Sequence, residues 1–187
     1  RLVGSEMCIR DSNEDANWEE KFWEPLEVKH SENKAFVTAR TFKTQFTATT
    51  FMQNAILLNG NLVNQNPSDV QTSSDKIQFS YEVKVEKSET VSFQKLGGYT
   101  VSLNHENTQT AAQNVIAEGL KIGYSTLLEN QKQAWSKIWE MSDITIDGDV
   151  KAQQGIRFNI FQLNQTYLGK DSRLNIGPKG LSLIHIS

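Results

Sequence analysis

The sequence predicts a mixed fold in which part of an antiparallel β-sandwich is followed by a helical region. Residues 34–101 are rich in threonine, phenylalanine and β-branched side chains, and they divide into short runs separated by turn residues. From residue 106 the pattern changes, because apolar residues recur at helical spacing as far as residue 141. Residues 150–168 form a further helical pattern. Strands that precede helices, rather than alternating with them, favour an antiparallel sheet.

Strands are expected at residues 35–42, 46–52, 55–58, 77–85 and 90–96. The fourth run alternates most regularly, with one face formed by Ile77, Phe79, Tyr81, Val83 and Val85. A period of two indicates a strand with one buried and one solvated face. Turns are predicted at residues 59–61 (Asn-Gly-Asn) and at Gly97-Gly98.

One or two helices are expected over residues 106–141. Gly119 and Gly123 lower the helix propensity in the middle of this range and predict a bend or a break there. A single apolar stripe is formed by Ile116, Leu120, Tyr124, Leu127, Leu128, Ala134, Ile138 and Trp139.

The second helical range, at residues 150–168, follows a short alternating stretch that ends in an Asp-Gly turn. Its main apolar line consists of Ile156, Ile160, Leu163 and Tyr167. Phe158 and Phe161 lie off that line, so the helix is apolar over much of its circumference. We therefore expect it to be buried in a larger helical assembly, which makes the chain a fragment of a longer protein.

The two ends of the chain differ from its middle. Residues 1–12 have neither helical nor strand periodicity and contain the single cysteine, Cys8. Residues 182–187 are an unrelated apolar run after a glycine-rich loop. Both resemble translated sequencing-adapter DNA, so we expect both to be non-native and set them aside. No apolar stretch of about 7–15 residues follows Arg1, which argues against a secretory signal.

Composition excludes several classes of function. The 187 residues include 19 Lys+Arg and 22 Asp+Glu, a formal net charge of −3, with no basic block. This balance argues against a nucleic-acid partner. No apolar run reaches the roughly 18 residues of a transmembrane helix, so no membrane partner is expected. A single cysteine excludes an internal disulfide framework and a cysteine-rich zinc site. We expect a soluble, cytoplasmic protein.

The acidic stretch at residues 143–149 partly matches a calcium-binding loop. Gln154 stands where such a loop needs its bidentate glutamate. We favour a tight turn with Asp149 as the N-cap of the following helix, and we expect no metal site.

Aromatic and histidine residues give weaker signals. Trp135 and Trp139 lie one helical turn apart and could stack on sugar rings, but packing between domains is the better interpretation at that spacing. His30, His105 and His185 are far apart in the sequence and support no nucleophilic triad. No catalytic residue is assigned.

The loop at residues 175–181, Asn-Ile-Gly-Pro-Lys-Gly-Leu, is the remaining candidate for binding. Gly177 and Gly180 permit close approach of a ligand to the backbone, and Lys179 could meet an anion. The loop lacks the pattern of a nucleotide-binding loop. Lys179 is therefore the candidate substrate-binding residue.

Residues 134–181 carry a family resemblance. Three successive runs carry it: Trp135-Ser-Lys-Ile-Trp-Glu-Met-Ser-Asp-Ile-Thr-Ile-Asp-Gly-Asp149, Gln153-Gln-Gly-Ile-Arg-Phe-Asn-Ile-Phe-Gln-Leu-Asn-Gln-Thr-Tyr167 and Arg173-Leu-Asn-Ile-Gly-Pro-Lys-Gly-Leu181. These runs closely resemble glycoside hydrolase family 65, in particular its phosphorylases that act on maltose. Trp23-Glu-Pro-Leu-Glu27 is also similar to that family.

The resemblance implies an N-terminal β-sandwich that a helical linker joins to an (α/α)6 catalytic barrel. On that basis residues 13–104 are the C-terminal part of the sandwich, 105–140 the linker, and 141–181 the start of the barrel with its first helix. The implied reaction is phosphorolysis of maltose with inversion, giving β-glucose 1-phosphate and glucose. It needs inorganic phosphate as co-substrate and no metal or organic cofactor.

The resemblance also implies that the catalytic groups lie outside this chain. In the family, the Gly-Pro-Lys-Gly-Leu loop is followed by a Gly-Glu-rich segment and a Trp-Asp-Thr-Glu motif, which residues 183–187 do not match. The expected linker contains four glutamates that we do not assign as the general acid: Glu106, Glu118, Glu129 and Glu140. Kojibiose or trehalose phosphorylases, a hydrolase of the family, and a non-catalytic carbohydrate-binding module remain alternatives. The family is often dimeric, so a homodimer is a further expectation.

Overall fold

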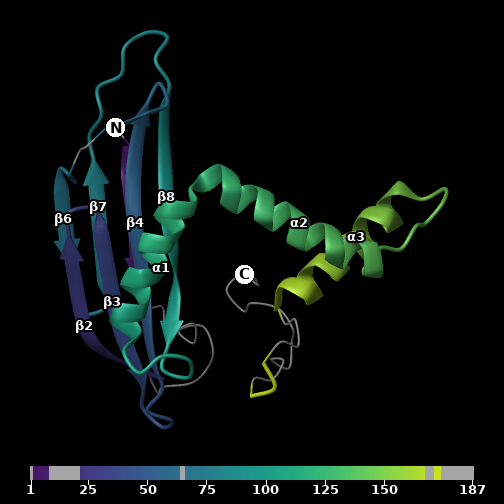
Figure 1. Ribbon diagram of the computed structural model, residues 1–187, viewed down its shortest axis with the longest axis horizontal. Coiled ribbons are helices and arrows are strands. Elements are labelled where there is room, and N and C mark those ends of the chain that lie inside the picture. The colour runs from purple at the N-terminus through teal and green to yellow at the C-terminus, as the bar shows by residue number, and fades with distance from the viewer. Residues whose placement is uncertain (1, 9–21, 64–65, 167–170, 174–187) are drawn as a thin grey trace. The chain divides into compact units, whose positions relative to one another are not determined.

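The computed structural model describes residues 2–8, 22–63, 66–166 and 171–173. The chain divides into two compact units, Arg1–Ile122 and Gly123–Ser187. The strands are β1 (Leu2–Cys8), β2 (Trp23–Ser31), β3 (Lys34–Thr41), β4 (Thr47–Leu58), β5 (Asn61–Val63), β6 (Asp69–Thr72), β7 (Lys76–Tyr81) and β8 (Val91–Val101). The helices are α1 (Thr108–Ile122), α2 (Tyr124–Ser142) and α3 (Val150–Thr166) (Figure 1).

The first unit is built from two antiparallel sheets and one helix (Figure 1). Among the described residues, one sheet has the order β1-β7-β6. The other has the order β2-β3-β4-β5, and β8 pairs with β4 as well. Every pairing is antiparallel. The predicted order of antiparallel strands followed by helices is confirmed.

The apolar core uses both faces of β4. Met52 and Ile56 pack with residues of the three-stranded sheet, and Phe51 faces the other way. The core between the sheets consists of Ala35, Val37, Met52, Ile56, Ile77, Phe79 and Tyr81. On the opposite face Phe36 and Phe51 pack against Ala112 and Ile116 of α1. Because side chains alternate along a strand, neighbouring residues of β4 serve two separate clusters.

Buried threonines connect the start of α1 to this sheet. The Oγ1 atoms of Thr49 and Thr108 lie 2.7 Å apart, and those of Thr38 and Thr49 lie 2.9 Å apart. The Thr100 hydroxyl donates to the backbone oxygen of Thr108 at 2.6 Å. Buried hydroxyl groups need partners, and here each partner lies on a different element, so α1 is held to β4 and β8 at its first residue.

Two predicted strand boundaries are wrong. The runs at 46–52 and 55–58 form one strand, β4, because Gln53 and Asn54 continue the ladder with β8. The run at 77–85 ends at Tyr81, where the pairing with β1 and β6 also ends. Val83 still packs on the core, whereas Val85 is 49% exposed. The predicted turn at residues 59–61 is confirmed, since Asn59 and Gly60 both have positive φ between β4 and β5.

The turn predicted at Gly97-Gly98 is also wrong, because β8 runs straight through both residues. Gly98 lies against the Phe51 ring, where an added Cβ would come within 2.9 Å of Cζ. A strand glycine often marks such a close approach, and this one makes room for an aromatic side chain in the core.

Four strands, β1, β2, β5 and β6, were not predicted. β2 carries Glu24, Pro25 and Glu27 and a register shift between residues 25 and 27, so its alternation is broken. β5 and β6 have three and four residues, too few for a clear period. β1 falls in the 1–12 segment and pairs with β7.

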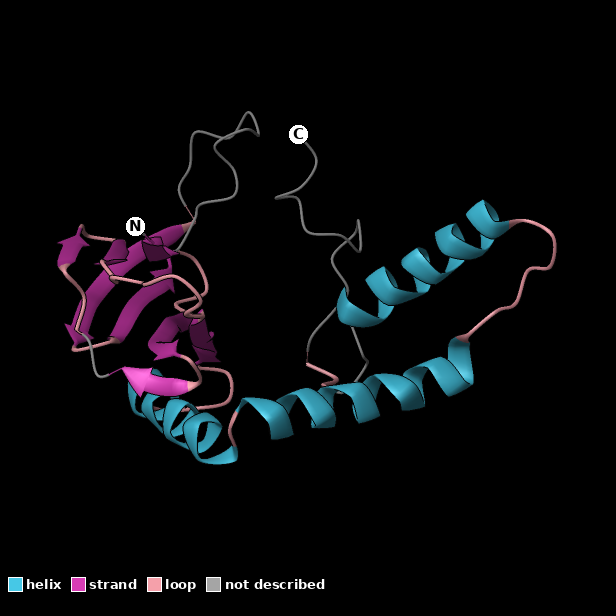
Figure 2. Cartoon of the chain, turned by 90° about the horizontal axis from the view of Figure 1, so that it is seen from above, coloured by secondary structure: helices cyan, strands magenta, loops and turns pink. Residues whose placement is uncertain are grey.

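The helices are close to those predicted. The break in the range 106–141 falls at Gly123, with φ 79° and ψ 157°, while Gly119 lies inside α1. The helix predicted at 150–168 is α3, and residues 143–149 form a loop rather than a strand. In the second unit α2 and α3 are joined by this loop and lie side by side (Figure 2). An (α/α)6 barrel is not established by these helices and stays a proposal.

Candidate functional site

The predicted binding loop at 175–181, with Lys179, lies outside the described residues, as does the 182–187 segment. The described structure nearest to it in the sequence is the α2–loop–α3 hairpin of the second unit. That hairpin makes up most of the described part of its unit and is held by several polar contacts, so the candidate site is built from it.

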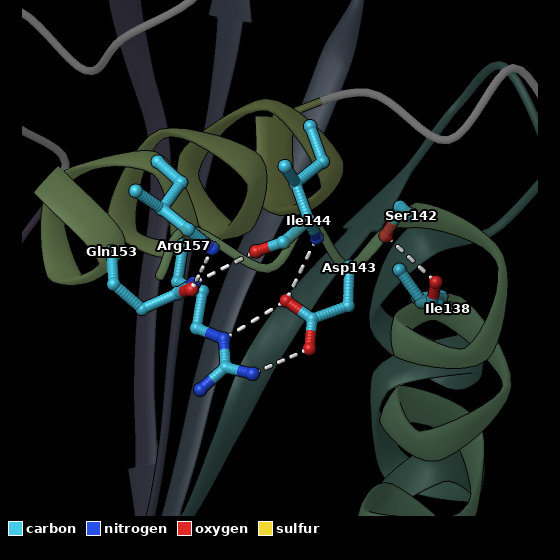
Figure 3. Close-up of polar contacts among 7 residues, drawn as sticks. Ile138, Ser142, Asp143, Ile144, Gln153 and Arg157 are labelled. Atoms are coloured by element: carbon cyan, nitrogen blue, oxygen red, sulfur yellow. Dashed lines mark hydrogen bonds and ion pairs between the residues drawn. The ribbon is translucent and has the colours of Figure 1, made fainter. Parts of the chain in front are cut away.

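Asp143 and Arg157 form a two-pronged ion pair between the end of α2 and the second turn of α3. Arg157 donates from Nε to Oδ1 of Asp143 at 2.9 Å and from Nη2 to Oδ2 at 2.5 Å (Figure 3). Asp143 Oδ1 also accepts the backbone N–H of Ile144 at 3.0 Å. The Arg157 hydrogen bonds hold the pKa of the Asp143 carboxyl below its usual range, and the same pair raises the pKa of Arg157.

Gln153 fixes the loop between the helices. Its Oε1 accepts the backbone N–H of Ile146 at 2.6 Å, and its Nε2 donates to the backbone oxygen of Ile144 at 2.8 Å (Figure 3). Asp149 caps α3, because its Oδ1 accepts the N–H of Ala152 at 2.9 Å. The predicted cap is confirmed, and Gly148 with φ 86° makes the turn before it.

Two of the three carboxylates of the calcium-like stretch, those of Asp143 and Asp149, are therefore used by the protein itself. Asp143 binds a guanidinium and Asp149 binds a helix N-terminus. Among the described residues, no group of three or more His, Cys, Asp or Glu side chains is placed to hold a metal ion. These contacts support a structural role for residues 143–149.

Trp135 and Trp139 pack within the hairpin. The Trp135 ring stacks on Phe161 of α3 with centroids 4.8 Å apart, and the two tryptophan rings lie 6.1 Å apart. A packing role is supported, since Phe161 covers a face of Trp135 that could stack on a sugar, but these contacts lie inside the hairpin and the predicted packing between domains stays a prediction.

The other residues considered from the sequence do not come together. His30 lies on β2 with its ring edge-on to Phe79, and His105 lies in the turn after β8. Glu118 lies on α1, while Glu129 and Glu140 lie on α2. No described pair of these groups has catalytic geometry, and no catalytic residue is assigned.

Sequence reasoning missed the Asp143–Arg157 pair and the role of Gln153. The available signal was slight: Gln153 and Arg157 are four residues apart and share one face of α3, but that helix carries several other polar side chains, so the pattern did not single these two out.

No described helix is both long enough and apolar enough to cross a membrane.

Comparisons with known proteins point to one family. The model of the glycosyl hydrolase family 65 N-terminal domain matches residues 3–138, a range that includes all of β1 except Leu2. The chain is 31% identical over 173 residues to a maltose phosphorylase of Bacillus subtilis (strain 168), covering 91% of this chain and 22% of that protein. It is 26% identical over 151 residues to an alpha,alpha-trehalose phosphorylase of Thermoanaerobacter brockii, covering 80% of this chain and 19% of that protein.

Two further matches extend the comparison. A kojibiose hydrolase of Flavobacterium johnsoniae is 30% identical over 109 residues, covering 58% of this chain and 16% of that protein. A solved structure, described as a candidate kojibiose phosphorylase from the human microbiome, superposes with a TM-score of 0.70 at 24% identity, covering 86% of this chain and 21% of that one. This structural likeness shows the fold.

The chain spans about a fifth of the length of the curated relatives it matches. The family model covers most of this chain, and the relative with 31% identity covers nearly all of it. The chain belongs to glycosyl hydrolase family 65.

Proposed function

We propose that this chain is part of an inverting disaccharide phosphorylase that converts maltose and inorganic phosphate into β-glucose 1-phosphate and glucose. The single observation that carries the proposal is the 31% identity to a maltose phosphorylase over 91% of the chain. The motif at residues 134–181, which resembles the same enzymes, supports it independently of the strand region.

In such a reaction one carboxylic acid protonates the leaving oxygen of the glycosidic bond. Phosphate attacks the anomeric carbon from the opposite face, in the place of the base and water of an inverting hydrolase. The configuration at that carbon is therefore inverted. The phosphate is a substrate, and the proposal includes no metal or organic cofactor.

This chain contributes framework to that enzyme in our proposal. Residues 13–104 belong to the β-sandwich, 105–140 to the helical linker and 141–181 to the start of an (α/α)6 barrel, with 1–12 and 182–187 as non-native ends. The general acid and the phosphate site belong to the rest of the protein, so the chain alone is expected to be inactive. Lys179 stays the candidate for contact with an anionic substrate. A cytoplasmic homodimer is also part of the proposal.

Another disaccharide specificity is the first alternative. The similarity to a trehalose phosphorylase and to a kojibiose hydrolase supports the same scaffold with a different substrate, or with water in place of phosphate. A stand-alone carbohydrate-binding module is the second alternative. The exposure of Phe158 and Leu163 on α3 weighs against it, because a finished module covers such side chains.

The test uses the full-length protein that carries this chain. Its gene is recovered through both ends, and the purified protein is incubated with maltose, trehalose, kojibiose or nigerose, each with and without inorganic phosphate. Glucose released from maltose only in the presence of phosphate supports the proposal. Equal release without phosphate contradicts phosphorolysis, and preferred release from another disaccharide contradicts the maltose assignment.

A further inference from the structure

The α2–α3 hairpin has little apolar packing of its own. In the described part of the second unit, α2 has no buried residue, and Ile160 of α3 is the buried hydrophobic side chain. The Trp135–Phe161 stack adds one aromatic contact. A contact this small leaves a helix free to pivot about it, so the angle between α2 and α3 must depend on other interactions.

Polar contacts at the loop end of the hairpin restrict the angle between α2 and α3. Asp143 follows the last turn of α2. Arg157, in the second turn of α3, donates hydrogen bonds to both carboxylate oxygens of Asp143 (Figure 3). Two parallel hydrogen bonds to a planar guanidinium fix orientation as well as distance.

Gln153 adds a second fixed point one turn earlier on the same face of α3. Its two hydrogen bonds hold the backbone of Ile144 and Ile146, on either side of one loop residue. Exposed ion pairs usually contribute little to stability, and the exceptions are two-pronged pairs within a network. This pair is two-pronged, and its two hydrogen bonds fix the orientation of α3 as well as any small gain in stability that they bring.

We propose that Asp143, Gln153 and Arg157 are positioning residues that set the angle at which α3 leaves α2. The inference rests on the proposed function in one respect. If α3 is the first helix of a catalytic barrel, its angle determines where the chain enters that barrel.

The direct test measures the angle in the 187-residue chain itself. Spin labels are placed on exposed polar positions of the two helices, Lys132→Cys on α2 and Asn159→Cys on α3, in a Cys8→Ser background. Pulsed electron paramagnetic resonance then gives the distribution of distances between them. The unmodified hairpin is expected to give one narrow distribution. Arg157→Gln and Asp143→Asn are expected to broaden or shift it, and Lys151→Gln, an exposed cation on the same helix, is not.

Two further variants separate positioning from charge and from folding. Arg157→Lys keeps the charge but cannot grip both oxygens, so it is expected to broaden the distribution as well. The reversed pair, Asp143→Arg with Arg157→Asp, is expected to narrow it again. Circular dichroism checks that α2 and α3 stay helical. If Arg157→Gln lowers the helix content, the distance distributions of Arg157→Lys and Asp143→Asn test the inference in its place. A distribution as narrow as the original in Asp143→Asn and Arg157→Lys overturns the inference.

The full-length enzyme gives the second readout. Arg157→Lys is expected to lower kcat/KM for maltose phosphorolysis by roughly tenfold or more, because small displacements of substrate-binding segments are costly. Lys151→Gln is expected to leave kcat/KM unchanged. An active enzyme whose kcat/KM is unaffected by Arg157→Lys overturns the positioning role. If the unaltered enzyme releases no glucose with phosphate, the proposed function fails, and the distance measurement still decides the inference.

Discussion

Gly98 and Gly119 lie on opposite sides of the contact between α1 and the five-stranded sheet, and each leaves room for one apolar side chain. A Cβ at Gly98 would lie 2.9 Å from Cζ of Phe51, and one at Gly119 would lie 2.8 Å from Cδ2 of Leu96. The Phe51 ring is rigid and 2% exposed, whereas the tip of Leu96 can rotate away. The two Cβ distances are similar, but an alanine is expected to destabilise the protein at Gly98 and not at Gly119.

Gly98→Ala is expected to lower the free energy of unfolding by about 1–3 kcal/mol, the usual cost of overpacking a core. Gly119→Ala is its matched control, since the gain in helix propensity of about 1 kcal/mol offsets the displacement of Leu96. Chemical unfolding followed by circular dichroism measures both. Equal losses at the two positions would contradict this account of the contact.

Tyr81 is a buried titratable group of the first unit, with 2% of its surface exposed. Its hydroxyl donates to Oδ1 of Asn33 and accepts from Nδ2 of Asn54, both at 3.2 Å. Burial raises the pKa of Tyr81 above its ordinary value of 10.0, although the Asn54 hydrogen bond opposes that rise. The neutral side chain is therefore favoured by folding.

Tyr81→Phe is expected to cost about 1–3 kcal/mol at neutral pH, because it removes the hydroxyl that hydrogen-bonds to the buried Asn54 and the half-buried Asn33. Since the folded pKa is raised, the stability from neutral Tyr81 is complete below pH 10.0 and is lost as the pH rises through the folded pKa. The difference between Tyr81→Phe and the unaltered chain should shrink in alkali. Denaturant titrations at several pH values test this, with the exposed Tyr99→Phe as control. A difference that is constant with pH would count against it.

At the scale of elements, Gly123 separates α1 from α2 with a backbone conformation, φ 79° and ψ 157°, that is almost confined to glycine. An added Cβ meets no atom within 4 Å, so strain rather than a clash decides the outcome. Gly123→Ala is expected to lower stability by about 1–3 kcal/mol. Gly155→Ala, at an open helical position, is the control and should be neutral or stabilising. A neutral Gly123→Ala in thermal unfolding would show that the break has another cause.

The hairpin has its own dependence on pH. The Arg157 hydrogen bonds hold the pKa of Asp143 below the ordinary value of 3.8, so the pair's contribution is complete above pH 3.8. It is lost as the pH falls through the lower folded pKa. Fluorescence of Trp135 and Trp139 should therefore change in acid in the unaltered chain and in Asp147→Asn, but not in Asp143→Asn. An identical acid transition in all three would contradict the assignment.

Sequence periodicity located those elements whose apolar residues repeat at the element's own period. Most of β7 and the three helices have that property, whereas β3 was located by its threonine, aromatic and β-branched residues. It failed for β2, an outer strand with charges, proline and a register shift. The prediction of a turn at Gly97-Gly98 was also wrong, because these glycines lie against Phe51, a residue far away in the sequence.

The candidate site was predictable only in part, for the same reason. The Asp149 cap and the turn before it depend on adjacent residues and were predicted. The Asp143–Arg157 pair joins residues 14 apart, and it exists only once α2 and α3 lie side by side. Lys179 was selected from its glycine-rich surroundings and stays a prediction, outside the described residues.

At the scale of the whole molecule, the chain combines a family 65 sandwich unit with a helical hairpin whose apolar side chains are largely exposed. Val150, Phe158 and Leu163 are 83%, 59% and 63% exposed. In the proposed enzyme the remaining four-fifths of the protein would carry the substrate chemistry. The proposed function is therefore decided by the reaction of the full-length protein.

The most direct test is proton and phosphorus magnetic resonance of the full-length protein incubated with maltose and inorganic phosphate. The account predicts that glucose and the β anomer of glucose 1-phosphate appear together in equal amounts, with no reaction when phosphate is omitted. Formation of the α anomer, or of two glucose molecules without consumption of phosphate, would contradict it.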